Sequence, residues 1–138
     1  MDVEFVTKNW YLFLALIVVV ALIVLDPIRR RASGVSVVSA TELPRLINHE
    51  SAIVVDISDV NDYKKGHVPN AINIPLDSFS DGINKLRKHK SKPIVVACRA
   101  GNRAARAASI LRKEGFESLY TLSGGFASWE KENLPVEK

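Results

Sequence analysis

The sequence predicts an α/β fold in which a parallel sheet is covered by helices on both faces. Short runs rich in apolar and β-branched residues occur at 35–38, 52–55, 94–97 and 118–122, and a stretch with helical periodicity follows each of them. Strands that alternate with helices along a chain favour a parallel sheet between helical layers. Ligands bind at the carboxyl ends of such strands, so we expect functional residues just after them.

Capping and stop signals mark the ends of the intervening helices. Ser39-Ala40-Thr41-Glu42 fits a capping box and predicts a helix with Leu43, Leu46 and Ile47 in the core. Gly115 is placed to end a later helix as its C′ residue. The other predicted helices span 59–65, 77–88, 104–113 and 126–132, and a brief additional strand spans 71–74.

Cys98 is the only cysteine of the chain, and it directly follows the predicted strand at 94–97. The loop after it leads into a helix, whose unpaired N–H groups and dipole attract anions. Arg99 and Arg103 add positive charge, which favours a thiolate, and Gly101 can adopt the positive φ of a tight loop. We therefore predict that Cys98 is a nucleophile. The alternative is a buried structural cysteine beside solvated arginines.

Composition limits the class of protein. A chain of 138 residues accommodates one ordinary domain plus an appendage. The net charge is +4 and no basic stripe is present, which argues against a nucleic-acid partner. A single cysteine cannot form an internal disulfide, so nothing requires an oxidising compartment.

An apolar segment precedes the domain. Residues 10–25 form an unbroken run of sixteen apolar residues. At about 1.5 Å per residue the run spans about 24 Å, against a hydrocarbon core of about 30 Å, so we expect residues 5–7 to lengthen it. This predicts a transmembrane helix, with a cleaved signal peptide as the main alternative. The predicted organisation is a short tail at 1–9, a transmembrane helix at 10–25, a basic linker at 26–34 and one domain at 35–138.

Flanking charges predict the orientation of that segment. Arg29, Arg30 and Arg31 follow it, whereas Lys8 alone precedes it. The positive-inside rule then places the N-terminus outside and the domain in the cytoplasm, as a single-pass membrane protein with lipid as a partner. The alternative is a solvated linker whose arginines have no topological role.

Three segments identify a family. Residues 56–75 (DISDVNDYKKGHVPNAINIP), 96–116 (VACRAGNRAARAASILRKEGF) and 122–129 (LSGGFASW) strongly resemble the rhodanese-like family, also known as thiosulfate sulfurtransferases, in order and spacing. The resemblance covers 35–138 and implies a single domain with a five-stranded parallel sheet between helices. One departure is that Ser58 stands where the family commonly has arginine, in the pattern Asp-x-Arg.

The resemblance also implies the site and its chemistry. Cys98 matches the family's nucleophile, which carries a sulfane sulfur as a persulfide. The rest of the six-residue active loop is the implied substrate-binding set: Arg99, Ala100, Gly101, Asn102 and Arg103. The implied donor is a small anionic sulfur compound, either thiosulfate or a persulfide, whose charge the arginines can hold, and the implied acceptor is a thiol or cyanide. The reaction requires no metal and no organic cofactor, and with no second cysteine the acceptor must be external.

Asp56 and His67 are expected to support the site. Asp56 ends a predicted strand, where it can orient the active loop or bind substrate, and capping and loop hydrogen bonds are the favoured role. His67 lies in a Gly-His-Val-Pro turn, where a backbone hydrogen bond is the favoured role over that of a base. His49 and His89 have no ligand-like spacing with Cys98, so no metal site is predicted.

Three functional classes remain open. The first is a sulfurtransferase at the cytoplasmic face of a membrane, with a membrane protein or a sulfur-trafficking protein as a further partner. The second is a membrane-tethered binding or scaffolding module with little catalysis. The third is a cysteine phosphatase or arsenate reductase, but that chemistry needs C-x5-R, whereas four residues separate Cys98 from Arg103.

Overall fold

A computed structural model describes residues 2–32, 34–99 and 103–138. The chain divides into two compact units, Met1–Ser33 and Gly34–Lys138, and each is described by itself. The second unit contains the whole sheet and the cavity that holds Cys98.

The N-terminal unit consists of two helices, α1 (Val3–Lys8) and α2 (Trp10–Ala32). Asn9 separates them, with a φ of −113° and a ψ of 24° that do not continue a helix. Large apolar side chains between Trp10 and Leu25 are exposed within this unit. Among the residues that the structure describes, no helix combines the length and the apolar character needed to cross a membrane.

The prediction of a transmembrane helix at 10–25 is therefore not supported. Residues 5–7, which were expected to lengthen the apolar run, belong to the separate helix α1. Without them, sixteen apolar residues span about 24 Å, which is less than a hydrocarbon core of about 30 Å. The predicted orientation, with the domain in the cytoplasm, remains a prediction.

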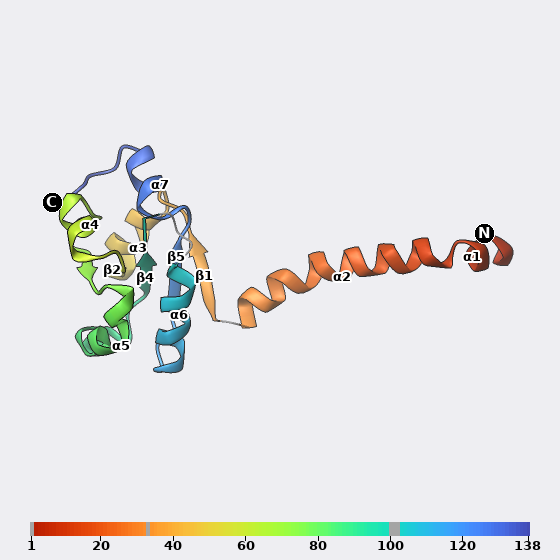
Figure 1. Ribbon diagram of the computed structural model, residues 1–138, viewed down its shortest axis with the longest axis horizontal. Helices are drawn as coiled ribbons and strands as arrows, with labels where there is room; N and C mark the ends of the chain where they lie inside the picture. Colours follow the sequence, from red (N-terminus) through yellow and green to blue (C-terminus); the bar gives the residue numbers. More distant parts are fainter. Residues whose placement is uncertain (1, 33, 100–102) are drawn as a thin grey trace. The chain divides into compact units, whose positions relative to one another are not determined.

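The second unit is built on a five-stranded parallel sheet (Figure 1). Its strands are β1 (Val35–Val38), β2 (Ile53–Asp56), β3 (Ile72–Asn73), β4 (Ile94–Ala97) and β5 (Leu119–Leu122). They lie in the order β1-β5-β4-β2-β3, and every neighbouring pair is parallel. Asp56 pairs with both Asn73 and Ala97, so β2, β3 and β4 end at one level. The predicted α/β fold with a parallel sheet is confirmed.

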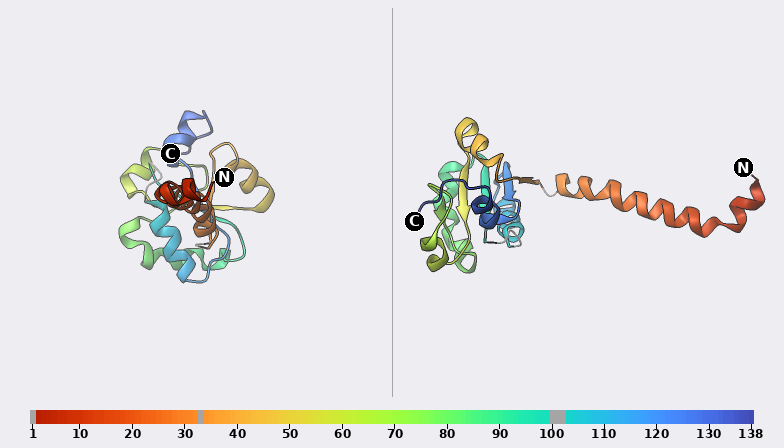
Figure 2. Two further views of the ribbon diagram at one scale, coloured as in Figure 1. Left: turned by 90° about the vertical axis from the view of Figure 1, so that its right-hand side faces the viewer. Right: turned by 90° about the horizontal axis from the view of Figure 1, so that it is seen from above.

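Helices cover both faces of the sheet (Figure 2). They are α3 (Leu43–Glu50), α4 (Val60–Lys65), α5 (Phe79–Gly82), α6 (Ala104–Lys113) and α7 (Gly125–Lys131), with 3-10 helices η1 (Leu76–Ser78) and η2 (Ile83–His89). Successive strand residues alternate between two apolar clusters. Val55 and Val96 pack with side chains of α5, η2 and α6, whereas Val54 and Val95 pack with those of α3 and α7. This alternation follows from the two-residue period of a strand.

Two local predictions were wrong in detail. The helix expected at 77–88 is divided into η1, α5 and η2. Gly82 lies at the second division, where an added Cβ would be 2.4 Å from Ile74 Cγ2, so this position suits glycine, which weakens helices. The expected capping box forms a turn instead. Ser39 Oγ accepts a hydrogen bond from Glu42 N at 3.2 Å, but α3 begins at Leu43.

Candidate active site

The carboxyl ends of β2, β3 and β4 surround a cavity of about 380 Å³. Segments from the ends of several elements meet here because these strands are parallel and in register. Among the described residues its lining consists of Ile57, Ser58, Asp59, Asp62, Pro75, Leu76, Asp77, Cys98, Arg99 and Arg103.

Cys98 is the first residue after β4 and is only 5% exposed. Its carbonyl accepts a hydrogen bond from Phe126 N at 2.8 Å, and the Arg99 carbonyl accepts one from Ala127 N at 3.1 Å. The first N–H groups of α7, which have no partner inside the helix, therefore hold the start of the active loop. The predicted loop residues 100–102 (Ala100, Gly101 and Asn102) lie outside the described residues.

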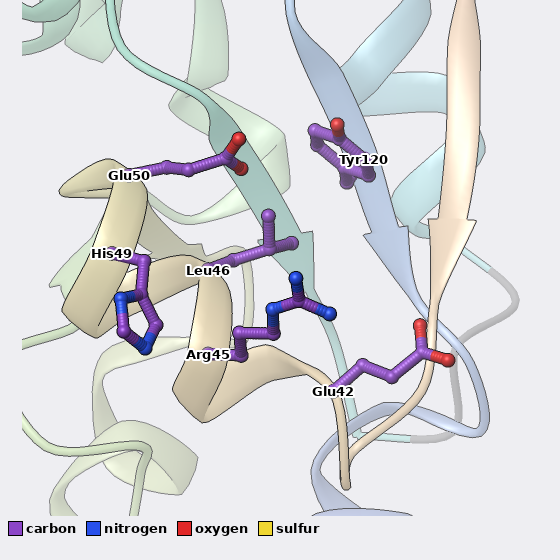
Figure 3. Close-up of a pocket in the computed structure, with 6 residues that line it drawn as sticks. All are labelled: Glu42, Arg45, Leu46, His49, Glu50 and Tyr120. Carbon is purple, nitrogen blue, oxygen red and sulfur yellow. The ribbon is translucent and has the colours of Figure 1, made fainter.

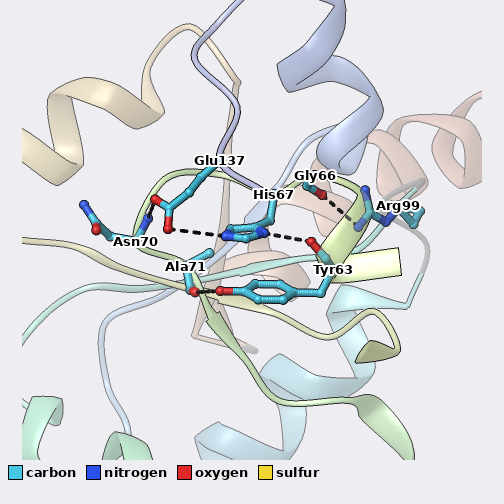
Figure 4. Close-up of polar contacts among 7 residues, drawn as sticks. All are labelled: Tyr63, Gly66, His67, Asn70, Ala71, Arg99 and Glu137. Carbon is cyan, nitrogen blue, oxygen red and sulfur yellow. Dashed lines mark hydrogen bonds and ion pairs between the residues drawn. The ribbon is translucent and has the colours of Figure 1, made fainter. Parts of the chain in front are cut away.

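Arg99 lines the cavity, but its guanidinium is bound to the backbone on one side (Figure 4). One terminal nitrogen donates to the Gly66 carbonyl at 2.9 Å and also to the Asp62 carbonyl. The guanidinium carbon lies 4.7 Å from the centre of the Phe126 ring, within the range of a cation–π interaction. These contacts join the active loop to α4 and α7.

Arg103 has different surroundings. It occupies the N-cap position of α6 without a side-chain cap, and its side chain is exposed. Within the described part of the chain its guanidinium makes no hydrogen bond or ion pair, yet it lines the same cavity as Cys98. An exposed guanidinium at this place can bind an incoming anion.

Asp56 shapes one wall of the cavity without lining it. Asp56 is 2% exposed, and its Oδ1 accepts a hydrogen bond from Ser58 N at 2.8 Å. Asn73 Nδ2 donates to the carbonyls of Asp56 and Ser58, at 3.1 and 2.9 Å. The turn after β2 is thus held from two sides, and it carries Ser58 to the cavity.

His67 lies outside the cavity, in the loop that follows α4 (Figure 4). It is 3% exposed, and its Nδ1 donates to the Tyr63 carbonyl at 2.8 Å, because a carbonyl can only accept. Its ring stacks on Tyr63, with centroids 3.7 Å apart. Burial raises the pKa of Tyr63, and Glu137 and Asp56 raise it further. The backbone hydrogen bond expected for His67 is thus present, while its supporting role at the site remains a prediction.

Sequence reasoning missed several residues around the site. Asp62 and Gly66 hold Arg99 through their carbonyls, and Phe126 packs against it. Glu137, near the C-terminus, contacts the loop that contains His67. Backbone carbonyls carry no sequence signal, and Glu137 is far from the loop in sequence. The family segments at 56–75 and 122–129 contain Asp62, Gly66 and Phe126, but the residue types there gave no sign of these contacts with Arg99.

A second, larger cavity of about 530 Å³ lies between α3 and β5 (Figure 3). Its described lining consists of Glu42, Arg45, Leu46, His49, Glu50 and Tyr120. The chain's cysteine is not part of this lining. We therefore place the candidate active site at the smaller cavity.

A family model described as a rhodanese-like domain matches residues 39–132. The chain belongs to the rhodanese-like family. This finding confirms the resemblance seen in the three sequence segments. The match includes Cys98, Arg99 and Arg103 and all of the cavity lining described above.

Several known proteins are similar to this chain over most of its length. An uncharacterized protein, YibN of Escherichia coli K12, is 34% identical over 134 residues, covering 96% of this chain and 94% of its own. The thiosulfate sulfurtransferase GlpE of Pseudoalteromonas translucida is 31% identical over 93 residues, 67% of this chain and 87% of its own. A crystal structure of a rhodanese-related protein from Thermoplasma volcanium is 29% identical, with a TM-score of 0.61, and covers 74% of this chain and 97% of that one.

Proposed function

We propose that this protein is a sulfurtransferase that carries a sulfane sulfur on Cys98 as a persulfide. The observation that supports this proposal most directly is the position of Cys98, at the end of β4 and inside a small cavity shared with an exposed arginine. Two relatives in different species bear the name thiosulfate sulfurtransferase, which supports the same chemistry.

The reaction proceeds in two steps. The Cys98 thiolate attacks the outer sulfur of thiosulfate, the sulfur–sulfur bond breaks, and sulfite leaves with the bonding electron pair. An acceptor thiolate or cyanide then attacks the outer sulfur of the persulfide, and Cys98 leaves as a thiolate. Atoms and electrons balance without an oxidant or a reductant. The acceptor must be external because the chain has no second cysteine.

The geometry favours a small donor. Cys98 is 5% exposed, so the reacting end of a donor must enter the cavity to reach it. Arg103 is exposed at the same cavity and can bind the negatively charged end of thiosulfate. The sulfite that leaves carries negative charge too, so this cation also stabilises the departing group.

Intact mass spectrometry of the full chain tests this proposal. We expect thiosulfate to add about 32 Da, one sulfur atom on the nucleophile, and cyanide to remove it. Cys98→Ser should show no gain. If neither thiosulfate nor a small persulfide donor changes the mass of the folded wild-type chain, the sulfurtransferase proposal is wrong and a binding module becomes the better interpretation.

We also propose that the N-terminal unit associates with a lipid surface. Within this unit the side chains of Ile17, Leu22 and Ile23 are 63%, 65% and 67% exposed, and apolar surface of this extent favours an apolar environment. The full chain should float with phosphatidylcholine–phosphatidylglycerol vesicles on a density gradient. A chain carrying Ile17→Asp and Leu22→Asp should not. Recovery of the unmodified chain away from the vesicles would contradict this proposal.

A further inference from the structure

The last residues of the chain return to the loop beside the active site. We name residues 134–138 the C-terminal strap. Leu134 packs against the apolar cluster of α3 and α7, and the Pro135 carbonyl accepts a hydrogen bond from the Trp129 indole at 2.7 Å. The strap is therefore attached to the domain before it reaches the loop after α4.

The strap pairs with that loop at His67. The backbone N–H groups of His67 and Glu137 each donate to the other residue's carbonyl at 2.9 Å, which forms an antiparallel bridge. The Glu137 carboxylate accepts a hydrogen bond from Asn70 N at 3.0 Å, and its other oxygen lies 3.7 Å from His67 Nε2 (Figure 4). One residue of the strap thus holds the loop through both its backbone and its side chain.

Gly66 transmits this contact to the active loop. It directly precedes His67, and its carbonyl accepts from the Arg99 guanidinium at 2.9 Å. Val136 of the strap packs against Gly66, where an added Cβ would be 3.0 Å from Val136 Cγ1. The direction of the Gly66 carbonyl therefore depends on His67, which the strap holds, and on Val136, which lies against Gly66 itself. Arg99 is in turn adjacent to the nucleophile Cys98.

We propose that the C-terminal strap, through Glu137, is a positioning element for the Cys98 loop. It orients the Gly66 carbonyl, and this carbonyl fixes the guanidinium of Arg99, the residue that directly follows Cys98. The positioning of Arg99 by the strap does not depend on the proposed sulfur transfer. Only the expected effect on the rate of persulfide formation rests on that proposed function. Glu137 does not line the cavity, so its role is to position and not to bind the donor.

The test compares three variants of the full chain. Glu137→Ala removes the acceptor of the Asn70 N–H, whereas Glu137→Gln retains an oxygen at that place. Glu130→Ala is the matched control, since Glu130 is an exposed glutamate of α7 outside the strap. Unfolding in urea shows that each variant is folded before any other measurement is compared.

The first readout is the NMR signal of the Arg99 Nε–H group, assigned with Arg99→Lys. This nitrogen is buried, so we expect its proton to exchange slowly enough with water to be observed. We expect Glu137→Ala to shift or broaden the signal, while Glu137→Gln and Glu130→Ala leave it close to that of the wild type. This readout does not depend on catalysis.

The second readout is single-turnover persulfide formation as a function of thiosulfate concentration. We expect Glu137→Ala to lower the maximal rate constant about tenfold, because small displacements of a reacting group have large effects on rate. The half-saturating concentration should change little, since no donor contact is lost. Glu137→Gln should restore most of the rate.

Three results would overturn or redirect the inference. An unchanged Arg99 signal and an unchanged rate in folded Glu137→Ala would overturn it. Equal changes in Glu130→Ala would also overturn it, because they would reflect a general effect on the domain. If the wild-type chain forms no persulfide, the proposed function fails, and the Arg99 signal alone decides whether the strap positions the loop.

Discussion

Arg99 and Arg103 bracket the same loop, but the fold places them in different surroundings. The Arg99 guanidinium is bound to the carbonyls of Asp62 and Gly66 and packs on Phe126. Arg103 is exposed and lines the cavity without a hydrogen bond to the described part of the chain. We infer from this difference in partners that Arg99 anchors the loop, and we propose that Arg103 binds the anionic donor.

The largest effect is expected from Arg99→Gln. The carbonyls of Asp62 and Gly66 would lose a charged donor, and each such hydrogen bond contributes about 1.5–3 kcal/mol. We expect the free energy of unfolding, measured by urea denaturation, to fall by about 3 kcal/mol. A loss below about 0.5 kcal/mol, the range of ordinary surface substitutions, would show that Arg99 is not an anchor.

Arg103→Gln should affect binding and leave stability nearly unchanged. Its side chain is exposed and holds no other described element, so the free energy of unfolding should change by less than about 0.5 kcal/mol. Loss of a charge-assisted contact with thiosulfate should raise the half-saturating concentration for persulfide formation about tenfold, equivalent to about 1.4 kcal/mol. An unchanged half-saturating concentration would remove Arg103 from the binding site.

A smaller effect is expected from replacing Asp77, one of the negatively charged residues that line the cavity. Asp77 is exposed and lines the cavity that thiosulfate enters in the proposed reaction. Asp77→Asn should lower the half-saturating thiosulfate concentration about twofold at low ionic strength, and added salt should abolish the gain. Asp81→Asn is the matched control, because Asp81 is exposed but does not line the cavity. An equal gain in the control would indicate a general charge effect.

The smallest effect is expected at Tyr63, whose ring stacks on His67, and it concerns stability at alkaline pH. Burial raises the pKa of Tyr63 above its ordinary value of 10.0, with further contributions from Glu137 and Asp56. The folded chain therefore retains this proton at pH values where the unfolded chain has lost it. The contribution of Tyr63 to the free energy of unfolding is therefore fully present below pH 10.0, and it is lost as the pH rises through the raised pKa. Tyr63→Phe should reduce the alkaline decline in urea titrations, and an identical decline would exclude this contribution.

Much of the fold could be predicted because its elements have strong local patterns. The strand at 94–97 and the helix at 104–113 have the predicted bounds, since one is a compact β-branched run and the other is rich in helix formers. The region at 77–88 has a comparable apolar periodicity, but close packing at Gly82 against Ile74 depends on tertiary structure. Such contacts are not visible in a local pattern.

The site could be predicted only in part, for a similar reason. Cys98 is marked by its place after a strand, and the resemblance to the family carried the rest of the loop. The partners of Arg99 are 37 and 33 residues away in sequence and are backbone carbonyls, which any residue type provides. The same holds for Glu137, whose contact with Asn70 spans 67 residues.

The most direct test measures both arginine variants in one experiment. Quenched intact mass spectrometry gives the rate of Cys98 persulfide formation against thiosulfate concentration for the wild type, Arg99→Gln and Arg103→Gln. We predict that Arg103→Gln raises the half-saturating concentration at a similar maximal rate, whereas Arg99→Gln lowers the maximal rate of the folded protein at a similar half-saturating concentration. If both variants raise the half-saturating concentration equally, both arginines bind the donor. The assignment of Arg99 to holding the loop and of Arg103 to binding the donor would then be wrong.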